Sequence, residues 1–218
     1  MYMKKSTEII LKELTERFPA LINVESDIEE AYNLLYECFA NGGRVYLCGN
    51  GGSAADCEHM AGELLKCFKL PRPLNDDFKK ALREHGEDGE VLADNLERGL
   101  PVVSLCGHAA FSTAFQNDNT PALVFAQQVN AYGREGDVLV AFSTSGNSQN
   151  CIYAAVCAKA LGMKVIVLTG RDGGKLKPIS DVSVVVPAKE TYQIQEYHLP
   201  VYHALCAMVE EEFFGTRN

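Results

Sequence analysis

Five short runs of apolar, mostly β-branched residues alternate with longer segments, and this alternation limits the fold more than any other feature of the chain. The runs are residues 45–48, 101–105, 138–142, 164–168 and 182–186. Helix-like patterns follow the first, third and fourth runs, at 53–67, 148–161 and, more weakly, 175–179. Strands that alternate with helices form parallel sheets covered on both faces. The sequence therefore predicts an α/β fold with a doubly wound, mostly parallel, five-stranded sheet flanked by helices.

The first forty residues contain two further helical patterns. The second opens with Ser26-Asp27-Ile28-Glu29, which has the spacing of a capping box. It then places five apolar residues on one face, namely Ile28, Ala31, Leu34, Leu35 and Cys38. We expect this helix to stop at Asn41-Gly42-Gly43 and to bury that face.

Residues 69–99 interrupt the alternation with a strongly charged stretch. Its residues favour one or two short exposed helices, and it has no strand pattern. We interpret it as an insertion in a single domain spanning 1–218, with a solvated helical excursion as the simplest role and a lid or oligomer contact as the alternatives. The last helical pattern, 192–214, contains Pro200, which predicts a kink or a late helix start there.

Length, charge and cysteine spacing limit the class of protein. A chain of 218 residues that is 47% hydrophobic can bury a full core. The formal net charge is −9 and no Lys/Arg run exceeds a pair, which disfavours a nucleic-acid or anionic-membrane surface. With no signal-like segment or membrane-spanning run we expect a cytoplasmic protein. The eight cysteines form no CxxC pair, so we expect reduced and mostly buried thiols.

Polar turns follow three of the predicted strands, where ligands of parallel sheets bind. The first is Asn50-Gly51-Gly52-Ser53. Its glycines allow close approach to a ligand, Ser53 can cap the following helix, and a helix N-terminus favours an anion. A plain tight turn explains this sequence equally well.

The second turn, Ser143-Thr144-Ser145-Gly146-Asn147-Ser148, is a more specific signal for phosphate. Its hydroxyls and backbone N–H groups are donors that a dianion needs. The alternative is a Ser/Thr-rich loop that only caps a helix. The third turn, 169–174, is a weaker signal that we interpret as a simple connecting loop, and we assign Arg171 no role.

A histidine and a glutamate, His59 and Glu63, stand four residues apart on the first of these helices and so share one face. Such a pair is most often a surface ion pair. Because the helix begins at the Gly-Gly-Ser turn, we expect both side chains near the strand-end crevice. The C-terminal segment adds Gln195, His198 and His203, whose donors together with His59 and Glu63 could hold zinc. Gln195 and His203 would, however, stand about 12 Å apart along a straight helix.

The motifs "CGNGGSAADCEHMAGEL", "GREGDVL" and "STSGNS" occur in this order and resemble the SIS (sugar isomerase) domain, specifically its phosphoheptose isomerase branch. The resemblance covers nearly the whole chain outside the insertion. It implies a flavodoxin-like SIS fold, a zinc-and-catalysis cluster and a phosphosugar site. The cluster maps onto His59, Glu63, Gln195 and His203, while His198 matches a position outside it. The substrate-binding positions map onto Asn50, Gly51, Gly52, Ser53, Asn117, Asp118, Ser143, Thr144, Ser145, Ser148 and Gln195.

The resemblance also implies an activity and an assembly. The implied reaction is the isomerisation of sedoheptulose 7-phosphate to D-glycero-D-manno-heptose 7-phosphate through an enediol, with Glu63 as base, His203 as acid and zinc as the cofactor. A carboxylate held tightly by zinc is a poorer base, and the sequence does not decide between these two roles of Glu63. Related isomerases are usually tetramers with sites between subunits, so we expect a homotetramer whose partners are its own copies and its phosphosugar substrate.

Two departures from the family pattern keep alternatives open. Tyr192 stands where the family commonly has an aspartate, and the insertion is absent from shorter members. One alternative is an isomerase of another phosphosugar. The other is a non-catalytic SIS module that binds a replication initiator or senses sugar phosphates. Such a module need not keep the acid and the base, and both are present here.

Overall fold

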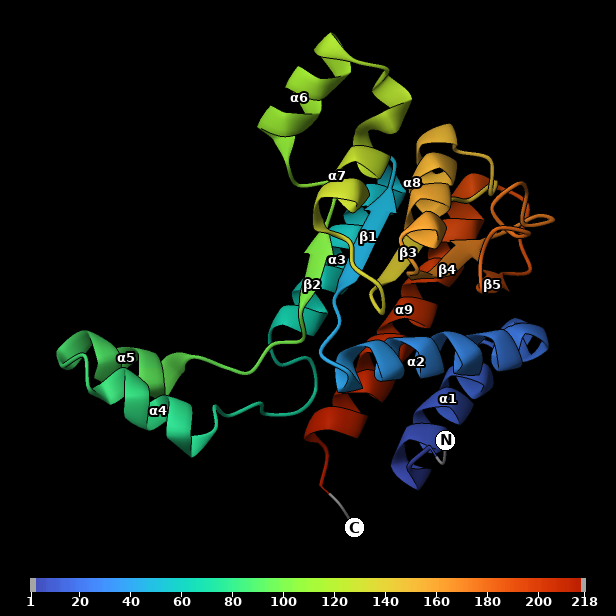
Figure 1. Cartoon of the computed structure of the whole chain (residues 1–218). Helices are drawn as coiled ribbons and strands as arrows, with labels where there is room; N and C mark the ends of the chain where they lie inside the picture. Colours follow the sequence, from blue (N-terminus) through green and yellow to red (C-terminus); the bar gives the residue numbers. More distant parts are fainter. Residues whose placement is uncertain (1–2, 217–218) are drawn as a thin grey trace.

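One five-stranded sheet organises the computed structural model of this chain, which describes residues 3–216 (Figure 1). Its strands are β1 (Val45–Gly49), β2 (Val102–Ser104), β3 (Val138–Phe142), β4 (Lys164–Thr169) and β5 (Val182–Val185). They lie in the order β2-β1-β3-β4-β5, and every neighbouring pair is parallel. The predicted α/β fold is confirmed, and each of the five predicted runs contains a strand. The chain leaves β1 toward β2 on one side and returns to β3 on the other, so a topological switch point lies between β1 and β3.

Helices cover both faces of the sheet, as a doubly wound fold requires. One face packs against α1 (Lys5–Arg17), α2 (Glu25–Ala40), α3 (Gly52–Leu65) and α9 (Thr191–Phe214). The other packs against α7 (Val124–Tyr132) and α8 (Gln149–Ala160). Each face of the sheet has its own hydrophobic core, and successive residues of β1 point into them alternately. Val45 and Leu47 pack in the core on the α1, α2, α3 and α9 side, and Tyr46 and Cys48 pack in the core on the α7 and α8 side.

The helices between the strands differ from the prediction in two places. A helix α6 (Ala109–Asp118), a short 3-10 turn η2 (Pro121–Leu123) and α7 follow β2, where the sequence predicts no helix. Helix α6 fully buries none of its residues, and its apolar contact with the core is limited to the half-buried pair Phe111 and Phe115. Residues 175–179, predicted as a weak helix, form turns instead. The N–H of Leu176 donates to the carbonyl of Gly146 rather than continuing a helix.

Two predicted helix boundaries also need correction. A 3-10 turn, η1 (Pro19–Val24), leads directly into α2, so Ser26 lies inside the first turn and cannot be the N-cap. The predicted apolar face of α2 is correct, and only Leu34 of its five residues remains half-buried. Helix α9 runs without interruption through Pro200, so the late start is wrong. The end of α2 at Ala40 agrees with the predicted stop.

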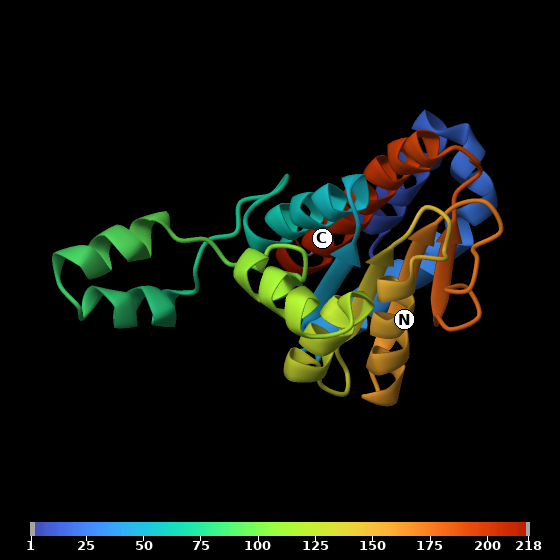
Figure 2. The same cartoon turned by 90° about the horizontal axis from the view of Figure 1, so that it is seen from above.

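The charged insertion forms two short helices, α4 (Asp76–Arg83) and α5 (Glu87–Asn95), that project from the sheet as a hairpin (Figures 1 and 2). Helix α4 has no buried residue, and Arg83 pairs with Glu90 and Asp94 across the hairpin. The predicted exposed helices are thus confirmed.

All eight cysteines are free thiols and five are buried, in agreement with the sequence. No helix within residues 3–216 has the length and apolar character needed to cross a membrane.

Candidate active site

Helices α3 and α9 lie side by side and run in the same direction, which aligns their polar residues in pairs. At the start of α3 Gly52 faces Gln195, seven residues later His59 faces His203, and Met60 then contacts Cys206. Both helices bury their remaining faces in the same core. Side chains far apart in the sequence therefore meet at fixed positions along this helix pair.

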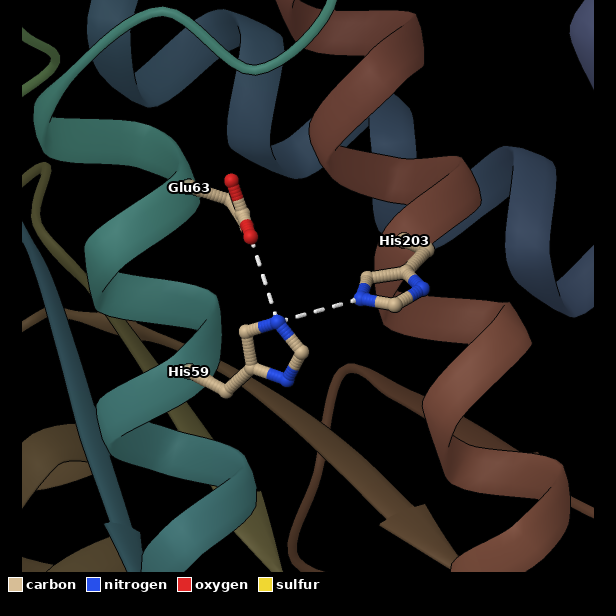
Figure 3. Close-up of side chains that lie close together, drawn as sticks. All are labelled: His59, Glu63 and His203. Atoms are coloured by element: carbon tan, nitrogen blue, oxygen red, sulfur yellow. Dashed lines mark hydrogen bonds and ion pairs between the residues drawn. The ribbon is translucent and has the colours of Figure 1, made fainter.

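His59, Glu63 and His203 form a cluster between these two helices (Figure 3). Nε2 of His59 lies 3.1 Å from Oε1 of Glu63 and 3.4 Å from Nε2 of His203. One ligand atom from each of the three side chains lies within 4.8 Å of the others. The cluster forms within one chain, so His203 reaches Glu63 without a second subunit.

The cluster is half open to solvent. The side chains of His59 and Glu63 are 45% and 15% exposed. Burial and the neighbouring His59 lower the pKa of His203, although Glu63 acts in the opposite direction. A cavity of about 400 Å³ between α1 and α9 opens beside His203. A ligand can therefore approach the cluster from the α1 side.

Two imidazoles and one carboxylate are a donor set that fits zinc. Catalytic zinc sites commonly have three such protein ligands and keep a fourth position open for water or substrate. His59, Glu63 and His203 supply this set, and their ligand atoms are close enough to share one ion after small rotations. The cluster is therefore a candidate metal centre.

Gln195 is not brought to this cluster. Its amide packs against the start of α3, where a Cβ on Gly52 would lie only 2.6 Å from Nε2 of Gln195. A side chain at position 52 is thus excluded, because Gln195 occupies its space. Along the continuous α9 helix Gln195 and His203 are about 12 Å apart, as the residue count predicts.

The first polar turn lies beside the second at the carboxyl edge of the sheet. Gly49 is the register partner of Phe142, so Asn50 and Ser143 follow neighbouring strands. The amides of Asn50 and Asn150 bond each other in both directions, at 3.0 and 2.8 Å.

The predicted cap by Ser53 is wrong. The N-cap of α3 is Gly51, in a positive-φ conformation, and no side chain caps the helix. Ser53 is buried one position inside α3.

The hydroxyl turn is an internally bonded loop. Ser143 Oγ donates to Ser148 Oγ at 3.0 Å, and the Asn147 N–H donates to Ser145 Oγ at 3.2 Å. Ser148 is the N-cap of α8, but its side chain does not bond the helix. The hydroxyls therefore do not serve only to cap, which favours the phosphate interpretation. The third turn supports this loop, because the Gly170 N–H donates to the carbonyl of Thr144 at 3.1 Å, and just after the turn the Lys175 N–H donates to Oδ1 of Asn147.

Asn117 and Asp118 are exposed at the C-terminal end of α6. Asn117 Nδ2 donates to Oδ1 of Asp118 at 2.9 Å. Other residues of α6, Ser112 and Gln116, line a cavity of about 490 Å³ together with Asn50. In one chain α6 thus faces the first turn rather than the histidine cluster.

The cluster and the strand-end turns are separated along α3. His59 is about 10 Å and Glu63 about 16 Å from Gly52 along the helix axis. A helix that follows a parallel strand runs back along the sheet, away from the edge where the strand ends. The expectation that His59 and Glu63 lie near the strand-end crevice is therefore wrong for a single chain.

His198 is fully buried, which agrees with its interpretation as an ordinary helix residue. Its ring packs edge-on against Phe142, and neither ring nitrogen has a hydrogen-bond partner within residues 3–216. Burial lowers the pKa of His198 to about 4.

Replacing His198 by Leu is expected to make the free energy of unfolding fall less steeply as the pH is lowered. The unfolded state takes up the proton near pH 6.5 and the folded state only near pH 4, so this histidine costs stability as pH falls between these values. The full difference corresponds to about 3 kcal/mol. Urea unfolding of both proteins from pH 7 to 4 measures it. Parallel curves over this range would contradict the assignment.

Known proteins support the family suggested by this geometry. The family model for the SIS domain matches residues 11–98 and 99–170. A phosphoheptose isomerase from Helicobacter pylori (strain P12) is 39% identical over 194 residues, which are 89% of this chain and 88% of the relative.

Solved structures agree with this relationship. A phosphoheptose isomerase from Francisella tularensis is 31% identical, with a TM-score of 0.73, and the match covers 95% of this chain and 100% of that one. The phosphoheptose isomerase GmhA from Neisseria gonorrhoeae is 36% identical, with a TM-score of 0.69, over 93% and 98% of the two chains. This chain belongs to the SIS domain family and, within it, to the phosphoheptose isomerases.

Proposed function

We propose that this enzyme interconverts sedoheptulose 7-phosphate and D-glycero-D-manno-heptose 7-phosphate. Its relatives are named phosphoheptose isomerases, and this chain matches them over most of their length. The observation that carries the proposal is the cluster of His59, Glu63 and His203, which supplies a carboxylate and two imidazoles within 4.8 Å. A sugar-phosphate sensor would have no need of this acid–base cluster.

The cluster can perform the two proton movements of an aldose–ketose isomerisation. Glu63 removes the proton from the carbon next to the carbonyl, and the same carboxyl returns it to the neighbouring carbon of the enediol. His203 exchanges a proton with the sugar oxygens. Zinc, where bound by His59, Glu63 and His203, would polarise the carbonyl oxygen. A Glu63 carboxylate held tightly by the ion would be a weaker base, so the metal-bound and proton-accepting roles of Glu63 compete.

The hydroxyl turn is the proposed phosphate site. Ser143, Thr144, Ser145 and Ser148 offer neutral donors at the start of α8, where a helix N-terminus favours an anion. Asn50, Gly51, Gly52 and Ser53 would contact the sugar, with Asn117 and Asp118 as further substrate positions. Binding of the distant phosphate orients the reacting carbons.

We further propose a homotetramer with active sites between subunits. The separation of the cluster from the strand-end turns supports this arrangement. A neighbouring copy would bring its Gln195 and its hydroxyl turn to the cluster and so complete both the metal and the substrate site. Light scattering of the purified protein tests the tetramer, and a monomer with full activity would contradict it. A cytoplasmic location suits phosphorylated substrates, which do not cross membranes unaided.

Turnover assays with purified protein test the proposed reaction. Metal-free and zinc-loaded enzyme is incubated with sedoheptulose 7-phosphate and, separately, with pentulose and hexulose phosphates. We expect turnover of the heptulose phosphate and faster turnover with zinc. Turnover of a shorter ketose phosphate alone would overturn the heptose assignment. Binding of sugar phosphates without turnover would instead favour the non-catalytic module.

A further inference from the structure

A buried tyrosine lies directly behind the metal candidate His59. Tyr202 is inaccessible to solvent, and its hydroxyl oxygen lies 2.9 Å from Nδ1 of His59. Its ring packs edge-on against both histidines of the cluster, with centroids 5.6 Å from His59 and 4.9 Å from His203. The tyrosine thus touches the ring nitrogen of His59 that points away from Glu63.

A carboxylate lies on the other side of this hydroxyl. Asp56 is one helical turn before His59 on α3, and it lies beside the Tyr202 hydroxyl: burial raises the pKa of both groups, and each also acts on the pKa of the other. Oδ2 of Asp56 is buried and has no hydrogen-bond partner within residues 3–216. A buried carboxylate oxygen without a full set of donors costs free energy. Because Asp56 lies beside the cluster, this cost is explained if the carboxylate serves His59 through Tyr202.

The donors and acceptors of these three groups fit only one arrangement when Nε2 of His59 holds a cation. Nε2 must then carry a lone pair, so the proton of the neutral ring is on Nδ1. Nδ1–H then donates to the oxygen of Tyr202. This leaves the O–H of Tyr202 free to turn toward the unpartnered Asp56 carboxylate oxygen beside it. Each group is used once, and the chain of bonds ends on an anion.

We propose that Tyr202 is a positioning residue that, with Asp56, fixes the tautomer and ring orientation of His59 for metal binding. The inference rests on the proposed function, since it assigns a role toward the metal of that site. Partners behind a metal-binding histidine orient its ring and raise its basicity, and their loss typically costs 10- to 100-fold in metal affinity or activity. Tyr202 touches neither the substrate position nor the reacting atoms, and it acts through His59.

The test is the zinc affinity of Tyr202→Phe, measured at equilibrium against a chromophoric chelator. Phenylalanine keeps the ring packing and removes only the hydroxyl, so we expect affinity about 10- to 100-fold weaker. Asp56→Asn keeps an acceptor oxygen without the charge, and we expect a smaller loss. The matched control is Tyr46→Phe, because Tyr46 is equally buried on the other face of the sheet and its hydroxyl donates to the Tyr132 carbonyl. This control should bind zinc like the wild type.

The outcomes separate this inference from the proposed function. Wild-type affinity in Tyr202→Phe would overturn the inference and leave the isomerase untouched. Equal losses in Tyr202→Phe and Tyr46→Phe would also overturn it, because they would show a general effect of removing a buried hydroxyl. If Tyr202→Phe does not fold, wild-type affinity in Asp56→Asn has the same consequence. Suppose instead that zinc affinity is weakest in Tyr202→Phe, intermediate in Asp56→Asn and unchanged in Tyr46→Phe, but that the wild type turns over no sugar phosphate. This result would support the role of Tyr202 and contradict only the proposed function.

Discussion

Replacing Glu63 by Gln is expected to lower kcat for the isomerisation by about 10²- to 10⁴-fold, the usual contribution of a positioned acid or base. Glutamine has nearly the same shape but cannot accept the carbon-bound proton. The side chain is only 15% exposed, and it keeps an oxygen for the contact with His59, so we expect the fold to survive. The measurement is turnover of sedoheptulose 7-phosphate at saturating substrate, with the zinc content of each sample determined alongside.

A matched exchange on the insertion serves as control. Glu90 is exposed on α5 and pairs with Arg83 across the hairpin, so Glu90→Gln should keep wild-type activity. A kcat of Glu63→Gln within a few-fold of the wild-type value would show that Glu63 is not the base. A loss of zinc in the variant would show that the carboxylate also binds the metal.

Replacing Arg72 by Met is expected to destabilise the protein by about 3–5 kcal/mol, the usual cost of leaving one partner of a buried ion pair uncompensated. Arg72 and Glu210 are 0% and 1% exposed, with Nε and Oε1 at 2.8 Å. The Arg72 guanidinium also donates to the carbonyls of Glu63 and Leu64. Glu210 in turn accepts the N–H groups of residues 68–70 at the root of the insertion. The pair thus joins the end of α3 to α9.

The exposed arginine of the insertion is the control for this experiment. Arg83 pairs with Glu90 and Asp94, and all three side chains are at least 43% exposed. Exposed pairs contribute about 0–1 kcal/mol, so Arg83→Met should change the free energy of unfolding very little. Urea titrations at pH 7 measure both variants. A loss of under 1 kcal/mol in Arg72→Met would contradict the structural role of the buried pair.

Periodicity was sufficient to predict the sheet but not the connections that follow β2 and β4. Strands β1, β3 and β4 are almost completely buried apolar runs, and β2 and β5 are short and mostly β-branched, so each is recognisable without knowledge of its neighbours. Helix α6 fully buries no residue and has only Phe111 and Phe115 half-buried against the core, which is a weak signal. Residues 175–179 have helix-like residues, but their backbone is used to support the hydroxyl turn. The local sequence pattern does not predict such hydrogen bonds between distant residues, because they depend on the tertiary structure.

The candidate site shows the same limit. The spacing of His59 and Glu63 predicts their shared face, and the family resemblance selected His203 rather than His198. The parallel packing of α3 against α9 decides that these three meet while Gln195 does not, and no spacing within either helix contains that information. Tyr202 and Arg72 went unnoticed because a tyrosine in an apolar helix and an arginine in a charged segment look ordinary. Only their burial reveals them.

The most direct test of a heptose isomerase centred on His59, Glu63 and His203 is a crystal structure of zinc-loaded protein with sedoheptulose 7-phosphate, recorded at the zinc edge. We predict one anomalous peak about 2.0–2.2 Å from the ligand atoms of these three side chains. The carbonyl end of the sugar should lie beside it, with the phosphate in the turn formed by residues 143–148. A sugar phosphate bound with its carbonyl carbons away from Glu63 and His203 would contradict the account.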